Sequence, residues 1–169
     1  MRNLMVGVAC ALALHAVCDA ATQATPGLNE TIDRRTIDRG RYLVKIAGCN
    51  DCHTEKYASK AGAVAEREWL TGDTVGSQGP WGTTYPANLR LVIANLTEAQ
   101  WMTAARQPRR PPMPWFALRD MTDSDVRAIY RFVRSLGPAG APAPAYVPPG
   151  GLVTTRFVIS EPPHPAQKR

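Results

Sequence analysis

The pattern of apolar and polar positions predicts a helical chain, with its clearest helix between Thr122 and Gly137. Apolar residues recur there at three- and four-residue spacing, the period of one helix face. These positions are Val126, Ile129, Tyr130, Val133 and Leu136. Thr122 is a favourable N-cap residue, and Gly137 with the following proline ends the pattern. We therefore expect a helix here that buries one side.

Two earlier segments also predict helices. Residues 31–47 carry apolar positions on one side and end at Gly48. Gly40 lies inside this segment at a cost of about 1 kcal/mol relative to alanine, and such a glycine usually lets another backbone approach closely. The sequence Thr97-Glu-Ala-Gln is a capping box that begins a short helix with Trp101 on its inward face.

The remaining segments predict loops, so the expected fold class is all-α. Residues 54–68 are polar and loosely helical, and residues 71–90 are rich in glycine, proline and threonine. Residues 107–114 contain prolines that exclude a helix. Residues 138–169 hold eight prolines and three glycines, so we expect an extended arm that packs partly on the domain.

The N-terminus has the layout of a secretory signal peptide over residues 1–20. Arg2 supplies a positive start, and a mostly apolar run from Leu4 to Val17 follows. That run of about fourteen residues is short for a membrane span, which needs about twenty. We expect cleavage after Ala20, with cleavage after Ala24 as the alternative. The protein is then expected to be periplasmic, and to contact the membrane only if the segment stays uncleaved.

Four segments follow from these boundaries. A signal peptide at 1–20 precedes a disordered leader at 21–30. The folded domain covers 31–137, and the proline-rich extended arm covers 138–169.

Removal of the signal peptide leaves two of the four cysteines, Cys49 and Cys52, with His53 directly after them. Cys-x-x-Cys-His is the attachment sequence of c-type haem. The two thiols add across the vinyl groups of the porphyrin, and the histidine binds the iron. The sequence therefore predicts one covalent haem c on Cys49 and Cys52, with His53 as an iron ligand.

Other uses of a Cys-x-x-Cys pair exist. An exported pair can form a disulfide, a thiol–disulfide redox site or half of a zinc site. A zinc site needs a fourth ligand, and His164 in the tail is the other histidine of the mature chain. A thioredoxin-like site expects alternating strands and helices, which this chain lacks.

Methionine is the candidate for the sixth iron ligand. Met113 lies between prolines on a stiff loop, which favours a weak thioether–iron bond because little entropy is lost when it forms. Met102 is most simply a core residue. Met121 is a core filler or an alternative ligand, and an open iron site is the third possibility.

These features resemble monohaem, His/Met-ligated class I cytochromes c over residues 37–136. The resemblance rests on Gly40-Arg-Tyr-Leu, on Gly48 to His53, on Met113-Pro114 and on the closing helix. It implies a small cytochrome c fold with crossing N- and C-terminal helices, short middle helices and long haem-wrapping loops. It places Gly40 at the crossing with Tyr130 or Val133 against it, and Met113 on the iron opposite His53.

Residues 79–89 resemble a loop in bacterial periplasmic cytochromes related to dehydrogenase cytochrome subunits. That likeness implies that Tyr85 and Asn88 hydrogen-bond the haem propionates, that Trp81 lies near the ring and that Arg90 is a counter-charge. The alternative is that Trp81 and Tyr85 are core aromatics of a long loop. Those relatives often carry several haems, whereas this chain has one attachment site.

A haem with both axial positions filled does not bind substrate but passes single electrons. We therefore expect a periplasmic carrier, or the cytochrome subunit of a dehydrogenase or oxidase, and not an enzyme. A haem enzyme or gas sensor with an open or displaceable sixth site is the alternative. The net charge of +6 and the arginines at 106, 109 and 110 favour an acidic redox partner, and the export signal argues against nucleic acid.

Overall fold

The computed structural model describes residues 28–160. The predicted signal peptide, residues 21–27 of the predicted leader and residues 161–169 of the arm lie outside this range. Helix α1 spans Leu28–Ile46, so the leader prediction is wrong for residues 28–30. The pair Pro26-Gly27, which is typical of a turn, comes directly before this helix in the sequence.

Six further helical elements follow α1 in the described chain. They are α2 (Cys49–His53), the 3-10 helix η1 (Glu66–Glu68), α3 (Leu89–Ala94), α4 (Glu98–Ala105), α5 (Trp115–Asp120) and α6 (Asp123–Leu136). Helices α1, α4 and α6 confirm the predicted ones, and both halves of the Thr97–Gln100 capping box are present. Helices α3 and α5, which are only six residues each, were not predicted.

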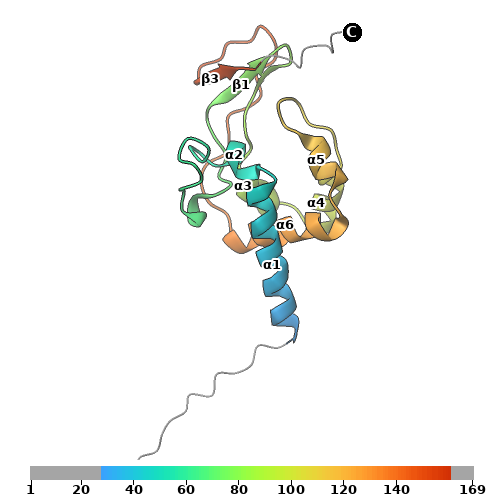
Figure 1. Ribbon diagram of the computed structural model, residues 1–169. Coiled ribbons are helices and arrows are strands. Elements are labelled where there is room, and N and C mark those ends of the chain that lie inside the picture. Colours follow the sequence, from blue (N-terminus) through green and yellow to red (C-terminus); the bar gives the residue numbers. More distant parts are fainter. Residues whose placement is uncertain (1–27, 161–169) are drawn as a thin grey trace, which may run out of the picture.

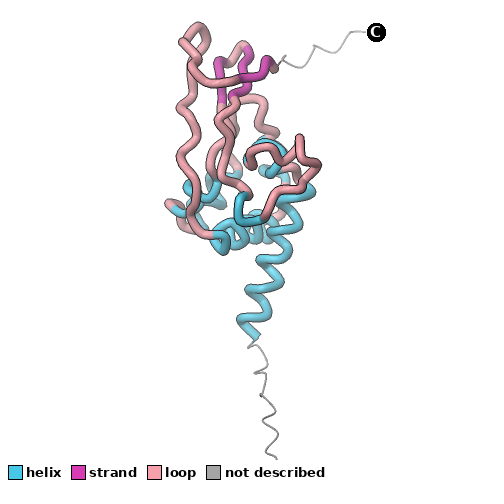
Figure 2. Tube along the Cα trace, turned by 90° about the vertical axis from the view of Figure 1, so that its left-hand side faces the viewer, coloured by secondary structure: helices cyan, strands magenta, loops and turns pink. Residues whose placement is uncertain are grey.

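A small three-stranded sheet departs from the all-α prediction. Strands β1 (Gly76–Gly79) and β2 (Gly82–Thr84) form an antiparallel hairpin. Strand β3 (Phe157–Ile159), from the proline-rich arm, pairs parallel to β1 and gives the order β2-β1-β3. The sheet lies at the end of the molecule away from α1 and α6 (Figures 1 and 2). The strands are short, and β3 is far from β1 along the chain. No alternation of apolar and polar residues within one segment therefore predicts the sheet.

Helices α1 and α6 cross at Gly40, as predicted. A Cβ atom at Gly40 would lie 2.0 Å from the carbonyl oxygen of Ala128 and 2.7 Å from Cβ of Phe132. The atoms nearest to Gly40 thus belong to Ala128 and Phe132, not to the expected Tyr130 or Val133. Ala128 and Phe132 are four residues apart and share the helix face that meets α1. The Tyr130 hydroxyl instead donates to the carbonyl of Leu96 at 2.9 Å.

The hydrophobic core lies around this crossing. Its fully buried side chains include Val44, Leu70, Ile93, Val126, Phe132 and Val133. The Trp101 indole lies in the same core and donates its N–H to the carbonyl of Val126 at 2.9 Å, which links α4 to α6. Within residues 28–160, no helix combines the length and the apolar character that a membrane crossing requires.

Candidate functional site

The Cys-x-x-Cys-His sequence forms a helix of its own, α2, directly after α1. Gly48 separates the two helices with a φ of 70°, in the left-handed region that favours glycine. Cys49 is half-buried, Cys52 is exposed and His53 is buried with 8% of its surface exposed. Both thiols are free. The predicted attachment residues therefore lie on one short helix at the end of α1.

The His53 ring is held by a backbone carbonyl from a distant segment. Its Nδ1 lies 2.7 Å from the carbonyl oxygen of Ala87. A carbonyl oxygen only accepts, so Nδ1 carries the hydrogen. Burial lowers the pKa of His53, and the bond to Ala87 opposes that shift. In the neutral ring the lone pair is then on Nε2, which is the form in which imidazole binds a metal.

The backbone of His53 is also fixed. Its carbonyl accepts from the N–H of Gly72 at 2.8 Å. Gly72 has a φ of 83°, and a Cβ there would lie 2.9 Å from both the Pro86 carbonyl oxygen and the Asn88 nitrogen. Only glycine allows this approach. The backbone around Gly72 therefore lies close to the segment that carries Ala87.

A buried polar chain stabilises the end of α2. The hydroxyl of Thr54 donates to Oδ1 of Asn50 at 2.7 Å and accepts from the N–H of Leu70 at 2.7 Å. Asn50 has none of its surface exposed, and its Nδ2 has no hydrogen-bond partner. Asn50 and Thr54 were not among the predicted site residues, although an asparagine and a threonine four residues apart can pair along one helix face.

Neither thiol has a lowered pKa. Burial raises the pKa of the Cys49 thiol to about 11, and burial also raises the pKa of Cys52. Catalytic Cys-x-x-Cys sites depend on a lowered thiol pKa. Among residues 28–160, no group of three or more His, Cys, Asp or Glu side chains is placed to hold a metal ion.

Met113 lies on the loop between α4 and α5 and is half-buried. Its carbonyl accepts from the N–H of Trp115 at 2.8 Å, and the Pro111 carbonyl accepts from the hydroxyl of Thr84 at 2.8 Å. The other two methionines of the described chain, Met102 and Met121, pack against the hydrophobic core. The loop of Met113 is thus anchored to the end of β2.

This anchor connects the segments that are linked to the two predicted iron ligands. Ala87, which holds His53, is three residues from Thr84, and Met113 is two residues from Pro111. An extended chain spans at most about 3.5 Å per residue, so these separations are at most about 10 Å and about 7 Å. Two hydrogen bonds, His53–Ala87 and Thr84–Pro111, and the few residues between them therefore link His53 to Met113.

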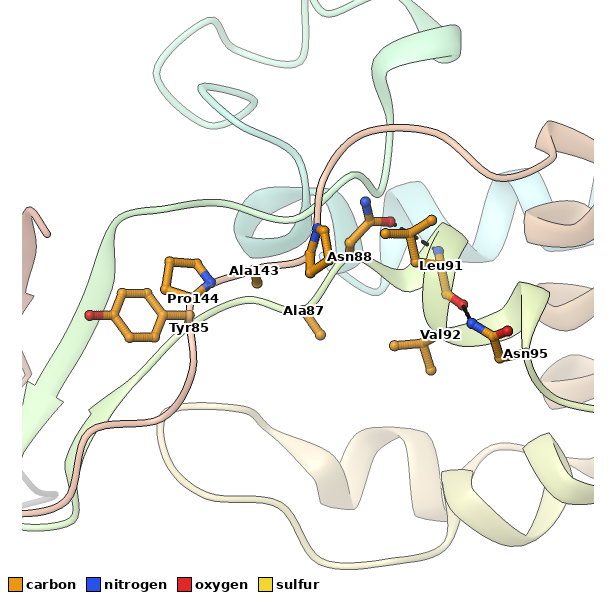
Figure 3. A pocket seen from close by; sticks show the side chains of 9 residues that line it. Tyr85, Ala87, Asn88, Leu91, Val92, Asn95, Ala143 and Pro144 are labelled. Atoms are coloured by element: carbon orange, nitrogen blue, oxygen red, sulfur yellow. Dashed lines mark hydrogen bonds between the residues drawn. The ribbon is translucent and has the colours of Figure 1, made fainter.

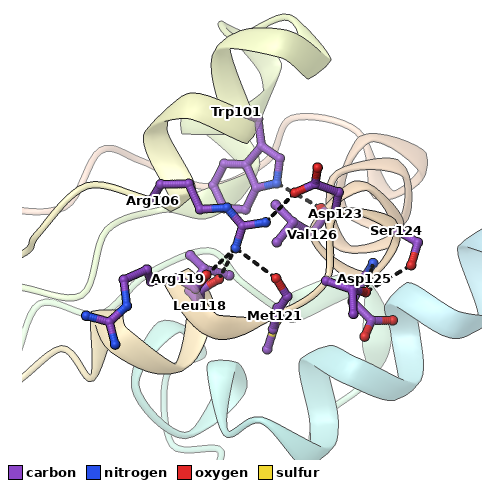
Figure 4. A network of polar contacts seen from close by, with 10 residues as sticks. Trp101, Arg106, Leu118, Arg119, Met121, Asp123, Ser124, Asp125 and Val126 are labelled. Atoms are coloured by element: carbon purple, nitrogen blue, oxygen red, sulfur yellow. Dashed lines mark hydrogen bonds and ion pairs between the residues drawn. The ribbon is translucent and has the colours of Figure 1, made fainter.

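Arg106 fixes the other side of the Met113 loop. Its Nη1 donates to the carbonyls of Leu118, Arg119 and Met121, and its Nη2 donates to Asp123 at 2.5 Å (Figure 4). Arg106 thereby ties the end of α4 to the end of α5 and to the start of α6. The Arg106 guanidinium is committed to these internal contacts, which argue against the expected role of Arg106 in docking a partner.

The remaining predicted site residues have protein partners. The Asn88 carboxamide caps α3 by accepting from Leu91 N at 3.1 Å and donates to the arm carbonyls of Ala139 and Ala141. The Arg90 guanidinium donates to the carbonyls of Arg67, Leu136 and Gly137. Both groups hold the fold together, so the structure gives no support to their propionate roles.

The two predicted aromatic residues lie toward the sheet. The Tyr85 hydroxyl pairs with the hydroxyl of Thr155 at 2.6 Å. The Trp81 ring lies over Gly79 at the tip of the hairpin. The backbone carbonyl of Trp81 accepts from the hydroxyl of Tyr146 at 2.7 Å. Its indole N–H has no partner. These contacts favour the alternative in which Trp81 and Tyr85 pack within the loop and the arm.

A groove of about 440 Å³ lies beside the segment that holds His53 (Figure 3). Its lining is mainly apolar and comprises Ala87, Leu91, Val92, Pro142, Ala143 and Pro144, with Tyr85, Asn88 and Asn95 as the polar members. The side chains of Ala87 and Val92 point toward the same open side. Its volume falls within the range of small-molecule sites, and the groove is open to solvent.

Comparisons with known proteins identify a family and several relatives of this chain. A family model described as "Cytochrome c" covers residues 37–137. The chain is 30% identical over 135 residues to the fructose dehydrogenase cytochrome subunit of Gluconobacter japonicus, covering 73% of this chain and 25% of that protein. It is 29% identical over 136 residues to the alcohol dehydrogenase (quinone) cytochrome c subunit of Gluconobacter oxydans, with 74% and 25% covered.

A nicotinate dehydrogenase subunit of Pseudomonas putida is 28% identical over 120 residues, which cover 64% of this chain and 9% of that protein. The chain thus spans a quarter or less of the length of these curated relatives. No solved structure matches it.

Proposed function

The chain belongs to the cytochrome c family, and from that premise we propose that Cys49 and Cys52 would attach its haem and that His53 and Met113 would hold the iron. Proteins of this family carry covalent haem c on a cysteine pair and transfer electrons. The chain is accordingly an electron carrier and not itself an enzyme. When bound, haem c supplies a centre that gains and loses one electron.

The hydrogen bond from His53 to Ala87 is the observation that supports this assignment most strongly. It fixes the ring orientation and the tautomer, and it leaves Nε2 as the nitrogen available to a metal. The bond also increases the electron density on the ring, which makes Nε2 a better ligand. His53 follows directly on the two free thiols in α2, so the attachment groups and the nitrogen ligand share one rigid turn.

The surrounding residues fit a flat apolar cofactor. Ala87, Leu91 and Val92 present apolar side chains in the groove beside the His53 anchor. Val92 is 39% exposed although it is a large aliphatic residue. A macrocycle against these side chains would remove that apolar surface from water, which contributes about 25 cal/mol per Å².

Met113 is the methionine whose surroundings support a role as ligand. Met102 and Met121 pack against the hydrophobic core, whereas Met113 lies on the loop tied down by Thr84 and Arg106. A loop that is already ordered loses little entropy when its thioether binds iron. The thioether ligand favours the reduced state and raises the potential.

We further propose that the protein is periplasmic and exchanges electrons with a dehydrogenase. The three relatives are named as subunits of fructose, alcohol and nicotinate dehydrogenases. The N-terminal sequence of this chain supports export, because it has the layout of a signal peptide.

Absorption spectroscopy of the purified protein tests the assignment. We expect covalent haem, a sharp reduced α-band, a weak methionine–iron charge-transfer band in the oxidised protein and no rapid binding of carbon monoxide when reduced. Immediate carbon monoxide binding would favour the open or displaceable site instead. Absence of covalent haem from a host that matures c-type cytochromes would overturn the proposal, and a Cys49→Ala/Cys52→Ala variant provides the baseline.

A further inference from the structure

The proline-rich arm continues beyond the part of the chain that the family model matches. That match ends at residue 137, whereas the structure describes the arm to residue 160. The arm is attached to β2, because Thr83 and Val147 exchange two backbone hydrogen bonds of 2.8 and 3.0 Å. Further along the arm, β3 pairs with β1. The arm is therefore an ordered addition to the cytochrome c domain, and its contacts indicate what it does.

Tyr146, which directly precedes Val147, contacts both the hairpin and the loop of Met113. Its hydroxyl donates to the carbonyl of Trp81 at 2.7 Å. The face of its ring holds the Arg110 guanidinium, whose central carbon lies 4.0 Å from the ring centroid. A cation within about 6 Å of an aromatic centroid is attracted by the ring. Tyr146 thus joins three segments that are far apart in the sequence: the arm, the hairpin and the loop between α4 and α5.

The loop of Met113 depends on such contacts because it has little core of its own. Residues 107–112 are exposed, and no residue from 107 to 117 belongs to the hydrophobic core or is among the apolar residues that pack against it. A segment with few buried apolar contacts opens at a low cost in free energy. The loop extends towards the sheet (Figure 1), where Thr84 donates to the Pro111 carbonyl and Tyr146 contacts Arg110. These two contacts hold the residues that directly precede Met113.

We infer that Tyr146 is a positioning residue for Met113, and that the arm, through Tyr146, keeps this loop closed so that the thioether stays available to the iron. The inference rests on the proposed function, because it takes Met113 as the iron ligand. A competing ligand binds only when the loop opens, so its apparent affinity scales with the fraction of open loop. The hydroxyl of Tyr146 orients the ring against the hairpin, and the ring in turn holds Arg110.

Imidazole titration of the oxidised holoprotein tests how often the Met113 loop opens. Imidazole competes with the thioether for the iron, and loss of the methionine–iron charge-transfer band reports its binding. We expect Tyr146→Ala to bind imidazole at least about threefold more tightly than the wild type. Tyr146→Phe should lie between the two, because it keeps the ring and loses only the hydroxyl. An unchanged affinity in Tyr146→Ala would overturn the inference.

Phe157→Ala is the matched control within the arm. Phe157 is also aromatic, and it is exposed to a similar extent, 41% against 37% for Tyr146. It lies in β3 and pairs with Gly76, on the side of β1 away from β2 and Thr84. Loss of its ring should therefore leave the imidazole affinity at the wild-type value. An equal gain in Phe157→Ala would show that any loosening of the arm has this effect, and it would overturn the role of Tyr146.

Arg110 provides a second test, because the inference requires its guanidinium and the Tyr146 ring to act together. Arg110→Gln should also tighten imidazole binding, but it should add little in a Tyr146→Ala background. Arg109→Gln removes the same charge from the neighbouring position, where the guanidinium donates to the carbonyl of Ala104 at 2.7 Å, and should leave the affinity unchanged. Additive effects of Arg110→Gln and Tyr146→Ala, or an equal effect from Arg109→Gln, would overturn the inference.

The spectra separate this inference from the proposed function. If the wild type lacks the methionine–iron band, the ligand assignment fails, and amide hydrogen exchange tests the hold of the arm on the loop instead. Faster exchange at Arg110, Met113 and Trp115 in Tyr146→Ala would then support that hold, and unchanged exchange would overturn it. If Tyr146→Ala does not yield folded holoprotein, Tyr146→Phe and Arg110→Gln provide the same test, with the α-band as the check on haem attachment.

Discussion

Nδ1 of His53 and the carbonyl oxygen of Ala87 are joined by a 2.7 Å hydrogen bond across 34 residues of sequence. This bond links the haem-attachment helix to the segment that also carries Thr84, and through Thr84 to the loop of Met113. A disturbance of the segment at Ala87 should therefore be detectable in the properties of both proposed iron ligands.

Gly72→Ala should disturb this arrangement. A Cβ at Gly72 would lie 2.9 Å from the Pro86 carbonyl oxygen, at a φ of 83°. We expect a loss of about 1–3 kcal/mol in the free energy of unfolding. We also expect a higher reduction potential, because a weakened His53–Ala87 bond makes the imidazole a poorer donor to the oxidised iron. Denaturation and redox titrations measure the two effects.

Gly150→Ala is the control for Gly72→Ala. Gly150 has a φ of 78° and nothing within 4 Å of a Cβ, so it incurs backbone strain of about 1 kcal/mol without a clash. An equal potential shift in both variants would contradict the role assigned to the segment at Ala87.

Met113→Ala should remove the methionine–iron charge-transfer band and open the reduced iron to carbon monoxide, with covalent haem retained. Met121→Ala should keep the band and lower only the stability, because Met121 packs against the core. Absorption spectra of both variants, oxidised and reduced, provide the measurement. A band that persists in Met113→Ala and vanishes in Met121→Ala would show that Met121, and not Met113, is the iron ligand.

Gly40→Ala should destabilise the protein by about 3 kcal/mol, because its Cβ would lie 2.0 Å from the Ala128 carbonyl oxygen and the backbones of α1 and α6 must separate. Arg35→Ala, at an exposed position on the same helix, should change the stability by about 0.5 kcal/mol or less. Chemical denaturation of both holoproteins tests the difference. Similar stabilities would mean that the crossing tolerates a wider separation.

Arg106→Ala should loosen α5. The carbonyls of Leu118, Arg119 and Met121 would each lose a donor, at a total cost of about 1–3 kcal/mol. We expect the methionine–iron band to weaken at a lower temperature than in the wild type. Arg109→Ala should leave that temperature unchanged, since Arg109 donates to a single carbonyl, that of Ala104. Arg106→Lys should lower that temperature less than Arg106→Ala does, but should not keep it at the wild-type value, because lysine lacks the planar fork of donors.

The pair of Arg39 and Asp125 predicts an acid-sensitive contribution to stability. The hydrogen bond from the Arg39 guanidinium holds the pKa of Asp125 below its ordinary value of 3.8. A carboxylate whose pKa is lower in the folded state stabilises the protein above pH 3.8, and that contribution is lost as the pH falls through the folded value. We expect Asp125→Asn to flatten the dependence of unfolding free energy on pH below about 4. In an Arg39→Gln background the same substitution should have a smaller effect.

The sequence predicted much of this protein because its signals are local. The Cys49-x-x-Cys52-His53 spacing determines the attachment chemistry within one helical turn, and Thr97, Thr122 and Gly137 mark helix ends through contacts within a few residues. Gly40 predicted a close backbone approach because it interrupts an otherwise regular helix. The short helices α3 and α5 were missed because six residues give too little periodicity to detect.

Tertiary structure alone decided which residues support the site and which support the fold. Nothing in the sequence distinguishes the Ala87 carbonyl, because a backbone acceptor has no side-chain signature. Asn88 and Arg90 have side chains that could bind propionates, but they donate instead to backbone carbonyls of the arm and of the end of α6. Arg106 and Arg109 are alike in sequence, yet one is committed to internal carbonyls and the other presents unpaired charge at the surface. Sequence determines which groups a segment carries, whereas their partners depend on which distant backbone the fold brings within hydrogen-bond distance.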